Sequence, residues 1–499
     1  MTHSVGQLLM IGFDGTEAPA YILEQVHTGQ LAGVVLLGRN VTHPGQVRAL
    51  TDSLQEAARH GGQPPLFIAI DHEGGNVQRL RTGVTRLPSQ MAVATQNNLD
   101  LAYILYRQHA RELQALGINW TFAPVLDVNN NPKNPVIGTR AFSDDVDRVA
   151  CFGETAVRAW LDGGIIPCGK HFPGHGDTDK DSHLTLPAVS HDRHRLDEIE
   201  LKPFRAAFRS GLPTVMTAHV QFPALDPSGV PATLSHRVMT DLLRHELGFG
   251  GVVITDSLGM KAISDTVGSA RGAVEAVNAG ADLCLFGHPA EHFAETCDTL
   301  AAAVESGVLT EARVVEALGR QDHLRSLIRE PGALVPPDLD LERQAYSQAI
   351  RIVGDRSLLP IPGPVHVISF EASPKTGAED AESRVAALLR RLEEAGLAVS
   401  HERLPIDPDP AAVRTALAAA NGRSLVVVAD HAVFRSGQEA LVQAVPTSVP
   451  LYLVALSNLA DLRLIHGRAH AVGLTLSDPT AEAQTWLGRA LSNLAAPVA

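Results

Sequence analysis

Short apolar runs alternate with longer amphipathic stretches over roughly the first 330 residues of the chain. Helix-like patterns such as Ala102–Leu116 and Thr240–Leu247 separate most of the runs, of which there are eight: Leu8–Phe13, Val34–Leu37, Leu66–Ile70, Trp120–Val125, Ile165–Cys168, Thr214–Ala218, Val252–Ile254 and Leu283–Phe286. Runs of this kind predict strands that are buried on both faces. Eight such strands, each followed by a helix, favour a (β/α)8 barrel over an open doubly wound sheet.

A second alternation begins at Val365 and predicts a smaller α/β sandwich domain. Its apolar runs are Val365–Phe370, Leu425–Ala429, Leu451–Ala455 and Val472–Leu476. Between the two alternations, proline-rich segments flank one helical stretch near Arg343–Ile352, which indicates a linker. We therefore expect a barrel at residues 1–333, a proline-rich linker at 334–363 and the sandwich at 364–499.

Composition narrows the class of protein. Among the 499 residues, 45% are hydrophobic and 19% charged, which is ordinary for a soluble globular chain. The formal net charge of −14 argues against nucleic acid or an anionic membrane as the main partner. The N-terminus shows no signal-peptide pattern, no segment reaches 18 apolar residues, and the four cysteines show no CxxC spacing. We expect a cytoplasmic protein with no membrane span.

The densest cluster of titratable side chains is the stretch KHFPGHGDTDKDSH, which directly follows an apolar run. Its proline and glycines exclude a continuous helix, so it is predicted to be a loop at a strand end. One interpretation is a zinc site built from imidazoles and carboxylates, namely His171, His175, Asp177 and His183. A second pairs Asp181 with His183 as an acid/base dyad, and a third is a solvated polar loop. The loop alone leaves all three open.

Polar residues also follow other apolar runs. The carboxyl ends of barrel strands form the active site of this fold, and five strands bring such residues to that end: Asp71 with Arg79, Asp127 with Arg140, Lys170 with His171, His219, and Asp256. Carboxylates and cations in one mouth suit a neutral sugar, because both make charge-assisted hydrogen bonds to hydroxyls. Asp256, in VVITDSLGM, has the character of a nucleophile, although a helix-capping role stays open.

Four motifs, KHFPGHGDTDKDSH, DHEGGNVQR, IGTRAF and ITDSLGM, together closely resemble glycoside hydrolase family 3, and within it the bacterial β-N-acetylhexosaminidases. The resemblance spans about residues 5 to 330. It implies a retaining hydrolase that removes terminal β-linked N-acetylglucosamine, often from peptidoglycan fragments. Single-domain members of the family stop near the end of the barrel, so this chain resembles the two-domain form.

The resemblance also implies roles for individual residues. By match to the family's motifs, Asp256 is the nucleophile and His183 the acid/base, with Asp181 as its dyad partner. The residues implied to contact the sugar are Asp71, Arg79, Arg140, Lys170 and His171. In the family resembled, His175 and Asp177 brace the loop, so we expect no metal and no cofactor. The expected partner is an oligosaccharide with a terminal N-acetylglucosamine, and the oligomeric state is not predicted.

The residues themselves support a dyad, because retaining glycosidases normally use two carboxyl groups and no second Asp or Glu presents itself as the acid. A histidine in that role would also repel an anionic acceptor less than a carboxylate would. A phosphorylase that uses the same site is therefore the alternative activity, and a non-catalytic amino-sugar-binding protein is the alternative class.

Overall fold

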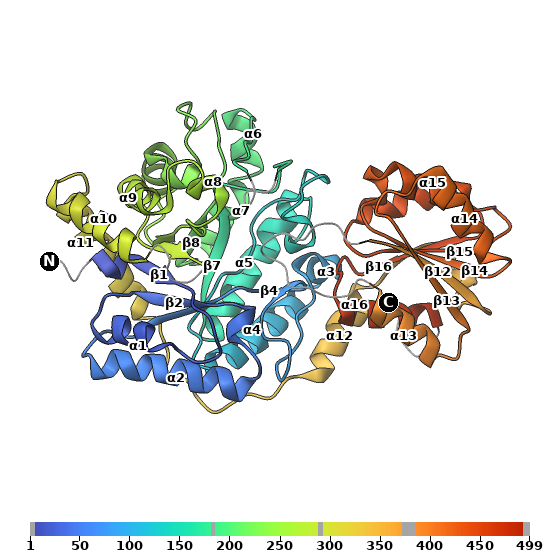
Figure 1. The fold of residues 1–499 in the computed structure, drawn as a ribbon, viewed down its shortest axis with the longest axis horizontal. Coiled ribbons are helices and arrows are strands. Elements are labelled where there is room, and N and C mark those ends of the chain that lie inside the picture. Colours follow the sequence, from blue (N-terminus) through green and yellow to red (C-terminus); the bar gives the residue numbers. More distant parts are fainter. Residues whose placement is uncertain (1–4, 181–184, 288–292, 372–384, 493–499) are drawn as a thin grey trace.

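A computed structural model describes residues 5–180, 185–287, 293–371 and 385–492 of the chain. Figure 1 shows a larger body, coloured blue to yellow along the sequence, and a smaller one in orange and red. The larger body is a barrel of parallel strands surrounded by helices, and the smaller one is a sheet covered on both faces.

Eight strands form the barrel in the order β10-β1-β2-β3-β6-β7-β8-β9. Their bounds are Leu9–Ile11 (β1), Gly33–Leu36 (β2), Phe67–Ile70 (β3), Trp120–Thr121 (β6), Ile166–Phe172 (β7), Thr214–Thr217 (β8), Val252–Ile254 (β9) and Cys284–Phe286 (β10). Every pairing between them is parallel, and a bridge between Ile254 and Leu283 joins the two ends of the sheet. The predicted (β/α)8 barrel is confirmed, and each predicted run overlaps one of its strands.

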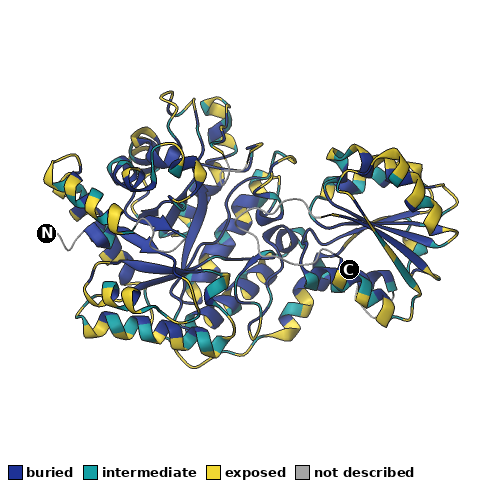
Figure 2. Cartoon of the chain, in the orientation of Figure 1, coloured by how far each residue is buried: buried dark blue, intermediate teal, exposed yellow. Residues whose placement is uncertain are grey.

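The helices that surround the barrel are α1 (Ala20–His27), α2 (Pro44–His60), α3 (Gln90–Thr95), α4 (Leu99–Ala115), α5 (Val146–Asp162), α6 (Arg193–Glu198), α7 (Lys202–Arg209), a π-helix at Arg237–Glu246, α8 (Lys261–Ser264), α9 (Ser269–Ala279), α10 (Phe293–Glu305) and α11 (Glu311–Arg325). Figure 2 shows why the strand runs are apolar: they are buried throughout, while the outer helices are buried on one side only. None of the described helices combines the length and apolar character that a membrane crossing needs.

Alternate residues of the barrel strands enter two different cores. Side chains such as Phe67, Trp120 and Met216 fill the interior of the barrel. Their neighbours, such as Ile68 and Val215, pack outward against the helices. Because the interior is filled, the space left for a ligand lies at the ends of the strands.

The second domain is built on a six-stranded sheet in the order β11-β16-β15-β14-β12-β13. Its strands are β11 (Arg351–Gly354), β12 (Val365–Phe370), β13 (Val399–Leu404), β14 (Ser424–Ala429), β15 (Leu451–Ala455) and β16 (Ala471–Thr475). One face packs on α13 (Ala386–Glu394) and α16 (Ala481–Ser492), the other on α14 (Pro410–Ala420) and α15 (Ser436–Ala444). The predicted α/β sandwich is confirmed.

Two strands of this sheet were not among the predicted runs. Both β11 and β13 lie at the edges, where part of each strand faces solvent, so neither shows a continuous apolar run. The segment predicted as a linker contains β11 and helix α12 (Leu339–Ala349), which packs against α3 and α4 of the barrel. The segment is therefore largely folded, and the two domain boundaries stay predictions.

Candidate active site

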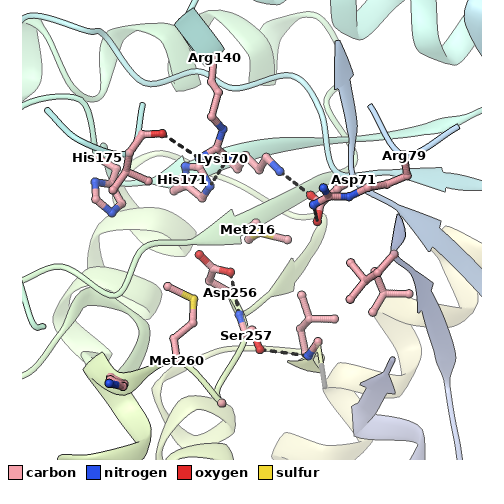
Figure 3. A pocket seen from close by; sticks show the side chains of 17 residues that line it. Asp71, Arg79, Arg140, Lys170, His171, His175, Met216, Asp256, Ser257 and Met260 are labelled. Atoms are coloured by element: carbon pink, nitrogen blue, oxygen red, sulfur yellow. Dashed lines mark hydrogen bonds and ion pairs between the residues drawn. The ribbon is translucent and has the colours of Figure 1, made fainter. Parts of the chain in front are cut away.

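A pocket of about 380 Å³ opens at the carboxyl ends of the barrel strands. Six residues predicted from the sequence line it together: Asp71, Arg79, Arg140, Lys170, His171 and Asp256. They come from four separate segments of the chain, and Figure 3 shows them around one common space. The fold brings residues from four of the five predicted strand ends to this pocket, whereas Asp127 and His219 are not among the residues that line it.

A short hairpin places Asp71 and Arg79 in this pocket and carries the buried Glu73 between them. It consists of β4 (His72–Gly74) and β5 (Val77–Gln78), with Asp71 immediately before it and Arg79 immediately after. Because side chains alternate along a strand, Asp71 and Glu73 point to the same side. The sequence analysis did not single out Glu73, although this spacing of two was the signal that could have identified it.

Glu73 is the centre of a buried ionic network. Its carboxylate accepts two hydrogen bonds from Arg140, at 2.9 and 2.8 Å, and lies 2.6 Å from Lys170 Nζ. The same ammonium donates to Asp71 Oδ1 at 2.8 Å, and Arg79 lies 3.6 Å from the other oxygen of Asp71. A bidentate guanidinium fixes the planes of both groups, so the network holds rigid positions for the cations.

The carboxylates and the ammonium of this network are ionised at neutral pH. Burial alone would raise the pKa of Glu73, but Arg140 and Lys170 outweigh it and lower that pKa to about 2. Burial also opposes ionisation of Asp71, yet Lys170 and Arg79 hold its pKa below the usual value. For Lys170, the two carboxylates outweigh burial and raise the pKa of the ammonium. The pocket therefore presents ionised groups that can bind hydroxyls.

Asp127 organises the strand end next to this network. Its carboxylate is fully buried and lies 2.7 Å from His171 Nδ1, which leaves His171 Nε2 directed to the pocket side near Arg140. The backbone N–H of His175 donates to Asp127 at 2.6 Å, and His175 Nδ1 lies 2.8 Å from the Thr178 hydroxyl. Both histidines thus have protein partners at Nδ1, and their positions are set by the loop.

The pKa of His175 is also set by this surrounding. Burial and the neighbouring His171 lower the pKa of His175 to about 4. At neutral pH its ring is therefore uncharged, so it does not serve as a proton donor with a suitable pKa.

Asp256 lies directly beyond β9, and its carboxylate faces the space below Lys170 in Figure 3. The Ser257 N–H donates to Asp256 Oδ1 at 2.7 Å, and His219 Nε2 lies 3.0 Å from the Ser257 carbonyl oxygen. Helix α8 begins later, at Lys261, with Met260 at its N-cap. The helix-capping role left open for Asp256 therefore does not apply, and its carboxylate lines the pocket instead.

Six apolar side chains form much of the remaining pocket wall: Val35, Leu37, Val136, Met216, Met260 and Leu285. These positions were not predicted, because an apolar strand residue that faces a ligand looks in sequence like any other core residue. An apolar wall of this kind can pack against the C–H face of a sugar ring and its apolar substituents, while the ionic network can bind the sugar hydroxyls.

Asp181 and His183 lie outside the described residues. Before the gap, the loop lines the pocket at His175. After the gap, Ala188 pairs with Gln221 in an isolated parallel bridge. Asp177, also in the loop, pairs with His191. The dyad therefore stays a prediction from the sequence.

Known proteins resemble this chain in sequence and in fold. The glycosyl hydrolase family 3 N-terminal domain matches residues 1–323. β-Hexosaminidase A from Pseudoalteromonas piscicida is 37% identical over 377 residues, which cover 69% of this chain and 63% of that protein. A β-hexosaminidase from Alkalilimnicola ehrlichii is 40% identical over 288 residues, which cover 56% of this chain and 81% of that protein.

A solved structure extends the likeness to the second domain. The family 3 β-N-acetylglucosaminidase from Paenibacillus sp. str. FPU-7 is 38% identical, with a TM-score of 0.89, and the match covers 99% of this chain and 96% of that one. The predicted class of enzyme, a glycoside hydrolase, is confirmed by these relatives. From the match over residues 1–323 and the likeness along both domains, the chain belongs to glycosyl hydrolase family 3.

Proposed function

We propose that this enzyme is a retaining exo-β-N-acetylglucosaminidase that works through a covalent bond between the sugar and Asp256. The observation that carries the proposal is the place of Asp256: a strand-anchored carboxylate in the same pocket as the cation-carboxylate network. The relatives support the sugar, since they are named β-hexosaminidases and a β-N-acetylglucosaminidase. A pocket at the end of a filled barrel suits the end of a glycan chain, hence an exo-acting enzyme.

In the proposed first step, the Asp256 carboxylate attacks the anomeric carbon while the bond to the leaving oxygen breaks. A proton from the acid/base passes to the leaving oxygen. In the second step, water gives a proton back to that base and displaces Asp256, so two inversions leave the configuration retained. Asp71, Arg79, Arg140, Lys170 and His171 hold the sugar during both steps.

We assign the acid/base role to His183, with Asp181 as its partner. Among the described residues that line the pocket, the pKa of Asp71 is lowered, that of Lys170 raised, and that of His175 lowered to about 4. His171 is held between Asp127 at Nδ1 and Arg140 near Nε2, and we assign it to sugar binding. An efficient acid/base needs a pKa near the working pH. Asp181, two residues before His183 in the sequence, would favour the imidazolium and move the His183 pKa in that direction.

The proposed substrates are peptidoglycan fragments that end in β-linked N-acetylglucosamine, and the proposed compartment is the cytoplasm. The formal net charge of −14 fits a small oligosaccharide that enters a pocket better than it fits binding to a polyanionic surface.

Analysis of the first product formed from an aryl β-N-acetylglucosaminide tests the activity directly. Proton NMR should show free N-acetylglucosamine that appears as the β-anomer and only later equilibrates. The same reaction run in phosphate separates the phosphorylase alternative, which would yield the sugar 1-phosphate. Initial release of the α-anomer would overturn the retaining mechanism, and formation of the sugar phosphate would overturn the hydrolase.

A further inference from the structure

Residues 85–90 connect the hairpin of the sugar pocket with the second domain. On the hairpin side, the Leu87 N–H donates to Gln78 Oε1 at 3.0 Å, and the Gly75 N–H donates to the Leu87 carbonyl at 2.9 Å. Gln78 ends β5, directly before Arg79, and Gly75 lies at the turn between the two strands. The backbone of residue 87 is therefore bonded to both arms of the hairpin.

The packing between the hairpin and this segment leaves no spare room. Gly74 and Gly75 both have positive φ, at 102° and 56°, which a side chain would disfavour. A Cβ on Gly74 would lie 2.4 Å from the Pro88 carbonyl oxygen, and one on Gly75 would lie 2.8 Å from Ser89 Cβ. A displacement of residues 88 and 89 must therefore displace the hairpin as well, because packed interiors transmit strain.

The second domain binds the other side of the same segment. The Ser89 N–H donates to Asp478 Oδ2 at 2.7 Å, and the Ser89 hydroxyl donates to the Ser477 carbonyl at 2.5 Å. Asp478 has no exposed surface, and its other oxygen accepts the Thr480 N–H at 2.9 Å. Figure 1 shows α3, which Ser89 caps, next to β16, which leads to Asp478. Bonds from backbone N–H groups to a buried carboxylate are among the stronger hydrogen bonds.

The segment also reaches the strand that carries Lys170. Gln90 makes two hydrogen bonds with the backbone of Val125, one to its carbonyl and one from its N–H, both at 3.0 Å. Val125 in turn forms a bridge with Lys170. Residues 87–90 therefore contact the hairpin, the neighbouring strand end and the second domain at once.

We propose that Asp478 is a positioning residue for the sugar pocket: by holding Ser89, it fixes the hairpin that presents Asp71, Glu73 and Arg79. The second domain is then part of the machinery that shapes the pocket, in addition to any role in stability. The inference rests on the proposed function, because that function makes the hairpin a sugar-binding element.

Three variants test this role. Asp478→Ala removes the carboxylate, Asp478→Asn keeps its shape without its charge, and Gln96→Ala serves as the matched control. Gln96 donates to the Ala345 carbonyl of α12 at 2.8 Å. Gln96→Ala therefore also removes a hydrogen bond between the end of α3 and residues beyond the barrel, but this bond does not involve the residues that hold the hairpin. Burial raises the pKa of Asp478 to about 6, so the measurements belong at a higher pH, where the carboxylate is ionised.

Two readouts separate positioning from stability: the inhibition constant of N-acetylglucosamine together with kcat/KM, and hydrogen exchange of the peptide that contains residues 72–79. In Asp478→Ala, kcat/KM should fall and the inhibition constant rise, each by roughly 10- to 100-fold, as expected when a binding group moves by about 1 Å. Exchange over residues 72–79 should accelerate. Asp478→Asn should recover part of both losses, and Gln96→Ala should change neither.

Unchanged exchange and unchanged inhibition in Asp478→Ala, with only a lower melting temperature, would overturn the positioning role. If Asp478→Ala does not fold, exchange of residues 72–79 in Asp478→Asn and in Ser89→Ala decides the question in the same way. Faster exchange in these variants, combined with no binding of N-acetylglucosamine by the unmutated chain, would support the positioning role and count against the proposed function.

Discussion

The two ends of the barrel each hold a buried ionic cluster, and one of them borders the pocket described above. At the mouth, Asp71 and Glu73 share Lys170, with Arg140 and Arg79 beside them. At the opposite end, directly before β10, Asp282 receives three arginines, namely Arg244 at 2.6 Å, Arg313 at 2.7 Å and Arg320 at 3.0 Å. Both clusters pair buried carboxylates with cationic side chains, so the comparison shows what else a binding site needs.

The difference lies in how the oxygen atoms are used. The carboxylate of Asp282 has no exposed surface. Besides the three arginines, the Val253 N–H donates a hydrogen bond to it at 2.9 Å, so protein groups fill its acceptor sites. At the mouth, Asp71 retains 23% of its side-chain exposure and borders the pocket. A cluster that is closed stabilises the fold, and one that leaves polar atoms facing a cavity can bind a ligand.

The predictions that test this contrast follow in order of their effect on turnover. His183→Ala should lose roughly 10² to 10⁴-fold in kcat/KM on substrates with a sugar leaving group. An aryl leaving group departs with little protonation, so the first step with that substrate should suffer far less. Azide needs no deprotonation and should partly restore turnover, and Asp181→Asn should show a milder loss. Equal losses on both substrate types without azide rescue would place the acid/base elsewhere.

Glu73→Gln tests the open cluster. The variant keeps the shape of the side chain but removes the charge that Arg140 and Lys170 share, so both cations should shift within the pocket. We expect kcat/KM for an aryl β-N-acetylglucosaminide to fall by about 10²-fold. The fraction of folded protein must be measured alongside, by circular dichroism. Unchanged turnover in folded protein would remove Glu73 from the account of the pocket.

Asp282→Asn is the matched change in the closed cluster. It leaves three guanidinium groups around a neutral side chain, which should lower the free energy of unfolding by roughly 3–5 kcal/mol. The kcat/KM of the folded fraction should not change, because Asp282 does not line the pocket. Urea denaturation and assays at low temperature measure the two quantities. A loss of turnover as large as that of Glu73→Gln would break the contrast between the two ends.

His175→Gln should alter the pH dependence of stability with little change in turnover. The folded state holds the His175 pKa at about 4, below its ordinary value of 6.5. As the pH falls from 6.5 towards 4, His175 is therefore protonated in the unfolded chain before it is protonated in the folded one. The free energy of unfolding decreases over this interval. Urea denaturation at both pH values should show a smaller loss in the variant, in which Gln can still contact Thr178. An identical loss in both proteins would contradict the lowered pKa.

The open cluster was predicted from the sequence except for Glu73 at its centre, and the closed cluster was not predicted. Asp71, Lys170 and Asp256 follow apolar runs closely, and the direction of parallel strands brings such positions to one end. Asp282 precedes a run, and its arginine partners come from helices far along the chain, so only the fold brings them together. Strand polarity is readable in a sequence, whereas helix-to-strand contacts are not.

The same limit explains the other gaps. The edge strands β11 and β13 lack the apolar runs by which the interior strands were recognised. Met216 and Leu285 line the pocket, yet in sequence they match the pattern of buried strand residues. Asp478 lies in the second domain, almost 400 residues from Ser89, and nothing in either local pattern connects them.

The central claim is a covalent intermediate on Asp256, and trapping it is the most direct measurement. In His183→Ala, an aryl β-N-acetylglucosaminide should still form the intermediate, whose breakdown is slow because water lacks its base. After an acid quench, peptide mass spectrometry should find one N-acetylglucosamine residue on the peptide that contains Asp256, and the double variant with Asp256→Ala should show none. Two results would contradict the account: a sugar bound to a different carboxylate, or a product of retained anomeric configuration formed with no sugar trapped at any position.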